Sequence, residues 1–206
     1  MQMIPAMPIR SITLLLATIF LFSCASSYKP ILPQQMTYTS LEGNEGIGYS
    51  YRYNVLRETG NKKYANKEEK KALKLVALQI KNNTNGDIRL KEHAKFYMGD
   101  NMVLPIEPAQ LHQQVKQIGA LYMLWSLLFL NITNCDKGEC SNIPIPIGLA
   151  GGLMNWSVAS KANKNFMTEL ITNNILDKTI APGETVTGLI GLSADASLPI
   201  EIRISQ

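Results

Sequence analysis

The residues of this chain that could do chemistry are few, and their spacing does not form a catalytic pattern. The 206 residues include two histidines, His93 and His112, and three cysteines, Cys24, Cys135 and Cys140. No serine or cysteine nucleophile accompanies either histidine in the sequence, so surface histidines are the simpler interpretation of both. We therefore expect a protein that is not an enzyme.

The sequence also indicates no cofactor, metal or nucleic acid. The acidic pair Asp136 and Glu139 has a spacing that matches no calcium loop. The glycines of residues 148–152 follow no predicted strand and lack the lysine of a phosphate-binding loop. The net charge of +4 is modest, and basic residues are not interleaved with aromatic ones as in nucleic-acid-binding proteins. We expect no cofactor, no metal ion and no nucleic-acid partner.

The two later cysteines lie close together in the segment Cys135-Asp-Lys-Gly-Glu-Cys140. In an exported protein, two thiols this close within a polar loop favour a disulfide. A zinc site would need further ligands, and both histidines lie in other sequence contexts. We predict a Cys135–Cys140 disulfide, with reduced thiols as the alternative.

The N-terminus has the pattern of a secretion signal. Arg10 is the only charged residue among the first 23, and a run from Ile12 to Phe22 follows that is apolar apart from two threonines. A positive start followed by a short apolar core is typical of a signal peptide, and the run is too short to span a bilayer. Residues 1–23 are therefore predicted to be a signal peptide.

The residues that end this signal resemble the lipobox of bacterial lipoproteins. Leu21-Phe22-Ser23-Cys24 has an aliphatic residue three positions before the cysteine and a small residue directly before it. Phe22 departs from the pattern, because that position more often holds a small or β-branched residue. The resemblance implies that Cys24 becomes the first residue of the mature chain and carries three acyl chains, palmitate among them. An ordinary signal peptide with an incidental cysteine, or an uncleaved anchor, is the alternative.

The same resemblance bears on location. Residue 25 is Ala rather than the Asp that usually retains lipoproteins in the inner membrane. The expected place is the cell envelope, lipid-anchored, and the outer membrane if the cell is diderm. Residues 24–45 are polar and turn-rich after the cysteine, so we predict a tether there.

Two parts of the mature chain, roughly 46–106 and 176–206, alternate apolar and polar residues as strands do. Tyr49, Tyr51 and Tyr53 form a stripe on one such strand, and core packing explains it better than a ligand platform. Lysines gather in residues 62–74, where a solvated linker or short helix is expected. The predicted strands are 47–54, 76–80, 88–90, 95–98, 102–104, 185–192 and 198–204.

Two stretches of these parts are similar to uncharacterised bacterial lipoproteins with an immunoglobulin-like β-sandwich. Residues 75–84 match an apolar strand that ends in an Asn-Asn-Thr turn, and residues 180–190 match a Pro-Gly-Glu turn followed by a strand. The resemblance implies that residues 46–206 form an antiparallel sandwich. The fold expected is mainly β, interrupted by a helical insertion at about 108–173, which a plain sandwich lacks.

The insertion is predicted to hold two helices, about 108–131 and 147–173, joined by the cysteine loop. Residues 118–130 are apolar on every face, so they must be buried in protein or lipid, and they are too few to span a bilayer. Packing of the helices on the sandwich or on each other is the favoured interpretation. The alternatives are contact with a lipid leaflet, helped by the close approach that Gly148 and Gly152 allow, or binding of an envelope protein or a second copy through residues 118–152.

These features together predict a non-enzymatic, membrane-anchored envelope lipoprotein that scaffolds or binds another envelope component. The alternative is a small-ligand or lipid-binding lipoprotein whose apolar helices line a pocket.

Overall fold

The computed structural model describes residues 24–38, 42–44, 46–136 and 139–204, and the predicted signal peptide lies outside these ranges. The chain divides into two compact units, each built from separate stretches of sequence. Unit 1 contains residues 24–27 and Ile118–Ser160, and unit 2 contains Tyr28–Gln117 and the chain from Lys161 onward. The helix α7, Ile147–Thr172, contributes residues to both.

The described part of unit 2 is built on a five-stranded antiparallel sheet with the order β1-β2-β3-β11-β7. Its central pair, β3 and β11, runs in register from Lys81 opposite Thr185 to Leu73 opposite Ser193. The strands are β1 Glu42–Asn44, β2 Ile47–Arg52, β3 Leu73–Asn82, β7 Pro105–Ile106 and β11 Thr185–Ser193.

Two smaller antiparallel sheets complete the strands of unit 2 in the described ranges. One has the order β12-β5-β6, and the other pairs β10 with β4. Their strands are β4 Ile88–Arg89, β5 Ala94–Met98, β6 Asn101–Val103, β10 Thr179–Ile180 and β12 Ile200–Ile204. Side chains from β5 and β12, such as Phe96 and Ile202, share one buried apolar core with Val76 and Ile80 of the large sheet.

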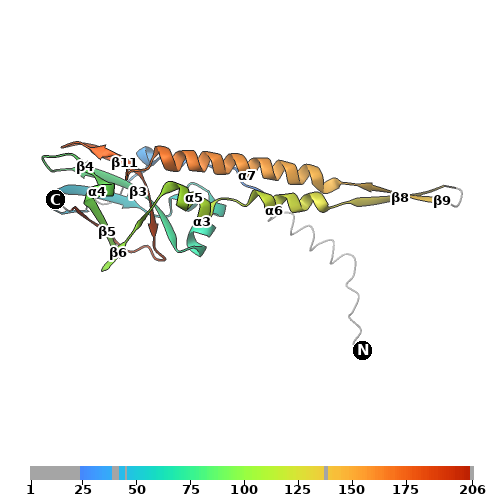
Figure 1. Ribbon diagram of the computed structural model, residues 1–206, viewed down its shortest axis with the longest axis horizontal. Coiled ribbons are helices and arrows are strands. Elements are labelled where there is room, and N and C mark those ends of the chain that lie inside the picture. The colour runs from blue at the N-terminus through green and yellow to red at the C-terminus, as the bar shows by residue number, and fades with distance from the viewer. Residues whose placement is uncertain (1–23, 39–41, 45, 137–138, 205–206) are drawn as a thin grey trace, which may run out of the picture. The chain divides into compact units, whose positions relative to one another are not determined.

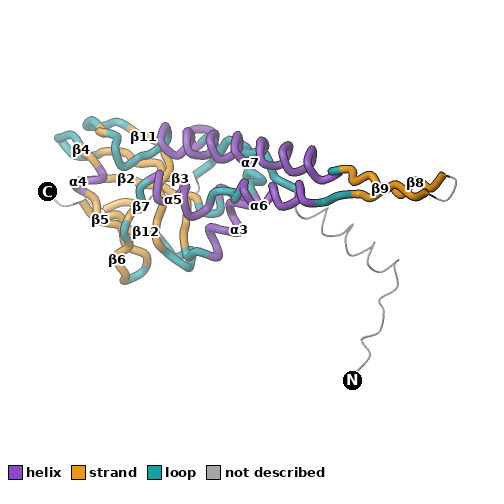
Figure 2. Tube along the Cα trace, turned by 45° about the vertical axis from the view of Figure 1, so that its right-hand side comes forward, coloured by secondary structure: helices purple, strands orange, loops and turns teal. Residues whose placement is uncertain are grey.

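The helices of unit 2 bury the other face of the large sheet (Figures 1 and 2). Tyr64, Leu111 and Phe166 pack there against Leu75 and Ala77 of β3. The elements are η1 Pro33–Gln35, α2 Val55–Glu58, α3 Lys62–Lys70, α5 Pro108–Val115 and the second half of α7. The short helix α4, Leu90–His93, instead contributes Leu90 to the first core. Because successive side chains of a strand point to opposite faces, β3 serves both cores, and its residues 75–78 are apolar without a break.

The fold is thus mixed, with helices and antiparallel sheets both prominent, rather than mainly β. The predicted strands and the helix at about 147–173 are confirmed, the latter as α7. The predicted helix at 108–131 is wrong, because α5 ends at Val115 and the chain is not helical again until Gly119. The side chain of Asn163 explains the break, because it bonds the backbone of Gln117 twice. Asn163 Oδ1 accepts from the Gln117 N–H at 2.8 Å, and Asn163 Nδ2 donates to the Gln117 carbonyl at 2.8 Å.

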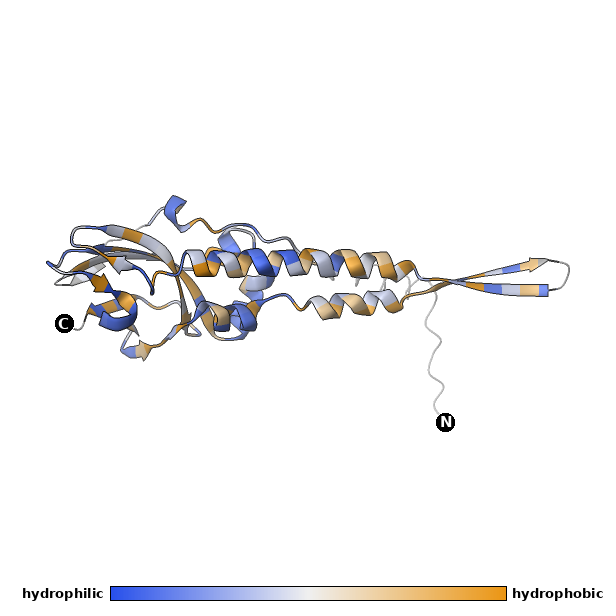
Figure 3. Ribbon diagram, turned by 45° about the horizontal axis from the view of Figure 1, so that its top comes forward, coloured by the Kyte–Doolittle hydropathy of each residue, from blue (hydrophilic) through white to orange (hydrophobic). Residues whose placement is uncertain are grey.

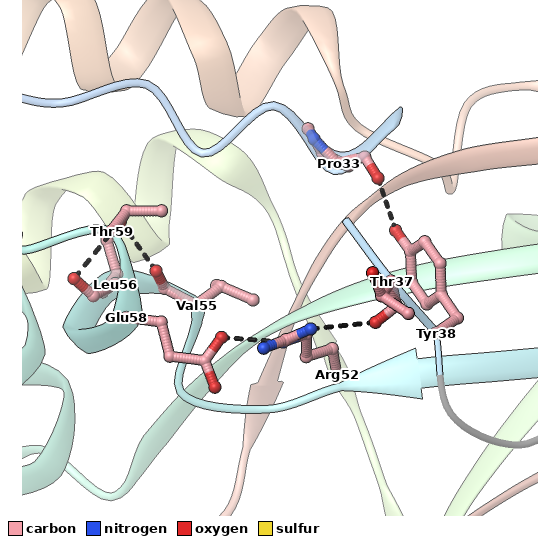
Figure 4. A network of polar contacts seen from close by, with 8 residues as sticks. All are labelled: Pro33, Thr37, Tyr38, Arg52, Val55, Leu56, Glu58 and Thr59. Carbon is pink, nitrogen blue, oxygen red and sulfur yellow. Dashed lines mark hydrogen bonds and ion pairs between the residues drawn. The ribbon is translucent and has the colours of Figure 1, made fainter. Parts of the chain in front are cut away.

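The segment expected to be a tether is packed on unit 2 from Tyr28 onward. Tyr28 and Ile31 are buried among the helices that cover the large sheet. Further along, the Tyr38 hydroxyl donates to the Pro33 carbonyl at 2.9 Å, and Arg52 donates to the Thr37 carbonyl at 2.9 Å (Figure 4). This part of residues 24–45 therefore belongs to the folded domain.

Unit 1 contains α6 Gly119–Met123, η2 Leu124–Leu127, β8 Leu130–Asp136, β9 Glu139–Ile145 and the first half of α7. The stretch α6–η2 lies beside α7, as Figures 1 and 2 show, and β8 pairs with β9 as a hairpin. None of the described helices has both the length and the hydrophobicity to cross a membrane.

Candidate functional site

The predicted acylation site lies in unit 1 and is exposed. Cys24 stands outside the disulfide, at the start of the described chain. The next residue is held on α7, because the Ala25 N–H donates to Asn155 Oδ1 at 2.6 Å. Asn155 in turn donates to the Gly151 carbonyl at 2.9 Å within the helix. The N-terminal end of the predicted mature chain is therefore fixed against one face of α7.

A cavity opens beside Cys24. It has a volume of about 290 Å³, which is near the small end of the range for ligand sites. Its walls are mostly apolar, with Asn155 as the main polar group. It is lined by Cys24, Trp125, Leu128, Ile147, Gly148, Gly151 and Asn155.

Two glycines allow α7 to approach η2 closely in unit 1. A Cβ atom at Gly148 would lie 1.7 Å from the Trp125 carbonyl oxygen, and one at Gly152 would lie 3.2 Å from the Tyr122 carbonyl oxygen. A distance of 1.7 Å is far inside van der Waals contact, so only glycine fits at 148 in this packing. The Gly-x-x-x-Gly step noted in the sequence thus permits close backbone packing, here within one chain.

We predict that Gly148→Ala opens unit 1, whereas Gly151→Ala leaves it intact. The alanine at 148 forces α7 away from Trp125, and overpacking of this kind destabilises by about 1–3 kcal/mol. Gly151 lies in the same turn of the helix, and a Cβ atom added there would meet nothing within 4 Å, so it is the matched control. Limited proteolysis within residues 118–152 measures the effect. Equal cleavage rates of the two variants would contradict the assigned packing.

Unit 1 exposes many large apolar side chains, which we call the apolar surface. Leu127 is 68 % exposed and Met154 is 70 % exposed. In Figure 3 apolar colours predominate along α6 and at the base of the hairpin. The surface consists of Ile118, Leu121, Leu124, Leu127, Phe129, Leu130, Ile132, Ile143, Ile145, Ile147, Leu149, Leu153, Met154, Trp156 and Val158. The sequence favoured helices that pack on the sandwich or on each other; α7 does pack closely on η2, but these side chains stay exposed.

The predicted disulfide is present and joins the two strands of the hairpin. Cys135 of β8 lies directly opposite Cys140 of β9, and their Cα atoms are 4.1 Å apart. The sequence suggested a polar loop at this point, but the pairing continues as strands on both sides of the cross-link. An isolated two-stranded hairpin is only marginally stable in water, so the disulfide helps to hold this one together.

One face of the hairpin is apolar near its base. Leu130 lies opposite Ile145, and Ile132 lies opposite Ile143. These four side chains are each at least 39 % exposed. Toward the tip the same face becomes polar, and the only charged residues of Ile118–Ser160 are Asp136, Lys137 and Glu139. Among the described residues of unit 1, the charged ones, Asp136 and Glu139, therefore form the last pair of the hairpin.

The histidines have separate, structural surroundings in unit 2. The backbone N–H of Arg89 lies 3.1 Å from His93 Nδ1, and His93 belongs to the short helix α4. His112 of α5 contacts the Asn163 carbonyl at 3.1 Å through Nε2, and burial lowers the pKa of its imidazole. Within the described residues, no group of three or more His, Cys, Asp or Glu side chains could hold a metal ion.

The tyrosine stripe belongs to the core. Tyr49 is buried, and the rings of Tyr51 and Tyr53 meet edge to face with centroids 5.6 Å apart. The Tyr53 hydroxyl donates to the Leu198 carbonyl at 2.6 Å. Packing rather than a ligand platform accounts for these residues, as the sequence favoured.

A groove of about 410 Å³ in unit 2 is organised by Glu169 of α7. The Glu169 carboxylate accepts from the Tyr28 hydroxyl at 2.5 Å and from the backbone N–H groups of Ile31 and Leu32 at 2.8 and 3.0 Å. Leu32 has φ 51°, a left-handed conformation that is unfavourable for a leucine. Because its oxygens are occupied by these donors, the carboxylate holds the chain in place rather than awaiting a ligand.

Glu68 of α3 is a buried carboxyl that the sequence placed among solvated charges. It is 6 % exposed, and its Oε1 accepts from the Leu75 N–H at 2.5 Å. Burial raises the pKa of Glu68 to about 7, and the nearby charges of Lys74 and Arg57 oppose this only in part. Its single specific partner is a backbone group, so we assign it a structural role.

A scan against protein-family models and searches of curated proteins and of solved structures find no match for this chain. Function must therefore be inferred from the residues themselves. Of the predicted site residues, the structure bonds Cys135 to Cys140 and places Cys24 beside the glycine-rich start of α7. The spacing of Gly148 and Gly152 signals close packing of α7, whereas no local feature of the sequence indicates that Cys24 lies beside this helix.

Proposed function

We propose that this chain is a non-enzymatic lipoprotein of the bacterial cell envelope, held on a membrane by acyl chains on Cys24. The observation that carries the proposal is the sequence Leu21-Phe22-Ser23-Cys24 after a positive residue and an apolar run. The exposure of Cys24 at the start of the described chain is compatible with its modification. In a diderm cell, Ala25 favours the outer membrane.

The physics of such an anchor is simple. Each methylene buried in the bilayer contributes about 0.8 kcal/mol, so one chain binds reversibly and two or more bind stably. Three acyl chains on one cysteine would hold the protein stably on the membrane. The Cys135–Cys140 disulfide supports export, because disulfides form in oxidising compartments.

In this proposal, unit 2 is the module that binds or scaffolds another envelope component. We also propose that its two larger sheets form an immunoglobulin-like sandwich, covered on one side by helices. Support comes from the apolar core that β2 and β3 share with β5 and β12, all within antiparallel sheets. The alternative is that the apolar surface binds a protein partner or a second copy of the chain through residues 118–152.

The anchor is tested by expressing the wild type and the Cys24→Ser variant in bacterial cells. We expect the wild type to incorporate labelled palmitate and to fractionate with membranes, and the variant to lose both. Cys135→Ser combined with Cys140→Ser is the matched control, since it removes the other cysteines and should keep the label. A Cys24→Ser variant that still takes up palmitate would contradict the proposal.

A second candidate function follows from the cavity beside Cys24. A mostly apolar space of about 290 Å³ suits a small ligand or part of a lipid, which would make the chain a lipid-binding lipoprotein. Native mass spectrometry of the mature chain with Cys24→Ser distinguishes the two. A bound lipid in the spectrum favours this candidate, and a ligand-free chain favours the first.

A further inference from the structure

We infer that the apolar surface of unit 1 docks on the lipid leaflet that receives the Cys24 acyl chains, at the level of the headgroups. The inference rests on the proposed function for its choice of membrane. It adds a second, protein-made contact with the lipid that the anchor itself does not require. Three independent features of the chain carry it: the distribution of apolar side chains, the distribution of charge, and the position of Cys24.

The apolar side chains of α7 in unit 1 occupy two sides of the helix. At about 100° per residue, one group spans about 40° and the other spans about 60° on the opposite side. The first group is Ile147, Met154 and Val158, and the second is Leu149, Leu153 and Trp156. Gly148 and Gly152 lie between the groups and pack on η2. Each of the six side chains is at least 39 % exposed.

Apolar side chains on both flanks of α7 call for an apolar environment on more than one side of the helix, and the boundary between headgroups and acyl chains can supply it. Apolar side chains are also exposed on η2 and at the base of the hairpin, where Leu124 is 60 % exposed and Ile143 is 56 % exposed. Contiguous exposed apolar areas of this kind mark a protein or membrane interaction site.

The charged residues that border unit 1 in the sequence favour an anionic lipid surface. Between Glu107 and Glu169, Asp136 and Glu139 at the hairpin tip are the only acidic residues. By contrast, a lysine lies within two residues of each point where the chain passes between the units, at Ser27, Ile118 and Ser160. These lysines are Lys29, Lys116 and Lys161. Each lysine near an anionic membrane surface contributes about 1 kcal/mol of attraction.

The depth of the contact is limited by the hairpin. The outer edges of β8 and β9 pair with no other strand among the described residues, and open strand edges are not tolerated in hydrocarbon. The polar tip at residues 136–139 also resists burial. Trp125 and Trp156 are amphipathic side chains of the kind enriched at the headgroup level. Unit 1 would therefore lie in the interface rather than cross the membrane.

The position of Cys24 identifies the leaflet as the occupant. Cys24 lines the same cavity as Trp125 and Ile147, and Ala25 is bonded to Asn155 of α7. Acyl chains on this cysteine would therefore enter the lipid next to the apolar surface. A tether this short gives the second contact a high effective concentration, so even weak apolar contacts would engage.

The test uses the mature chain from residue 24 with Cys24→Ser, which carries no lipid. Trp125 and Trp156 are the only tryptophans of the protein, and both lie in unit 1, so tryptophan emission reports on this surface alone. With phosphatidylcholine vesicles we expect a blue shift, quenching by brominated lipid and co-sedimentation. Vesicles that also contain phosphatidylglycerol should bind more strongly, and added salt should remove that gain.

Matched variants distinguish binding through this surface from non-specific hydrophobic binding. Leu124→Gln combined with Leu127→Gln is expected to weaken partitioning by an order of magnitude, roughly tenfold or more. Met102→Gln combined with Leu104→Gln removes two equally exposed apolar side chains from unit 2 and should leave binding unchanged. Equal losses in the two pairs would overturn the inference.

Other outcomes are equally decisive. If emission does not respond to vesicles while the acylated wild type still fractionates with membranes, the inference is wrong and the anchor stands. If a defined oligomer forms, and its tryptophan emission is already blue-shifted and does not change when vesicles are added, a second copy covers the surface and the inference is overturned. If the unacylated chain binds vesicles but Cys24 takes up no palmitate in cells, the membrane surface is supported and the proposed anchor fails.

Discussion

Replacing Glu169 with alanine is expected to lower the free energy of unfolding by about 3 kcal/mol and to release the chain around Tyr28. The variant removes the acceptor of one hydroxyl and two backbone N–H groups. Hydrogen bonds to charged groups contribute about 1.5–3 kcal/mol each, and the loss is reduced here because the carboxylate is only half-buried and Leu32 can relax from its strained backbone. Urea unfolding measures the change, and hydrogen exchange of residues 28–36 locates it.

Two milder variants act as controls for Glu169. Tyr28→Phe removes only the hydroxyl contact, and its ring still packs on Phe166 with centroids 5.2 Å apart, so a loss of about 1 kcal/mol is expected. Glu169→Gln keeps an oxygen for the Ile31 and Leu32 N–H groups and should fall between the two. If Glu169→Ala matches the wild type within error, this carboxylate does not hold the segment.

Glu68→Gln is expected to stabilise the protein at neutral and higher pH but not in acid. The folded-state pKa of about 7 lies above the ordinary value of 4.5, so the folded protein binds this proton more tightly than the unfolded chain does. Stability from this group is therefore complete below about pH 4.5 and is lost as the pH rises through about 7. The full difference corresponds to about 3 kcal/mol.

The measurement is the free energy of unfolding of wild type and Glu68→Gln across this pH range. The gap between them should grow from near zero in acid to about 3 kcal/mol above neutrality. The glutamine oxygen can still accept from Leu75. Glu69→Gln is the control at the next position, where the carboxylate is exposed and paired with Arg57 at 3.0 Å. A gap that does not change with pH would contradict the buried, uncharged state assigned to Glu68.

Much of unit 2 could be predicted from local pattern. The alternation in β2 and β12 and the turns at Gly99 and Gly183, which have positive φ, are local signals that the fold leaves in place. The unbroken apolar stretch at residues 75–78 of β3 goes beyond simple alternation. It reflects burial on both faces of the sheet, which the helices make possible, and a sandwich alone does not require it.

The insertion was predicted less well, because its elements depend on contacts distant in sequence. An apolar run such as residues 118–130 has no periodicity that distinguishes helix from strand. The break after α5 depends on Asn163, which lies 46 positions from Gln117. The disulfide was predictable from the spacing of the two cysteines alone. The strands around it were not predicted, because Pro144 and the polar residues near the cysteines are not typical of strands.

For the candidate site, the sequence predicts acylation of Cys24 but does not indicate what surrounds this residue. Nothing local links Ala25 to Asn155, which is 130 positions away. Glu169 looked like one polar residue on a long helix, and only the fold brings it to Ile31. Carboxylates that act through distant partners cannot be recognised from spacing along the chain.

The mutual bonds between Gln117 and Asn163 have a consequence for how this protein could have arisen and how it can be altered. They bring together the two ends of unit 2 between which residues 118–160 are inserted. A host whose two ends already meet can accept inserts of different length at little entropic penalty, since closure grows only slowly with loop length. An insert of another length would be tolerated if it ended in a helix that continues into residues 161–172, because α7 runs through this boundary.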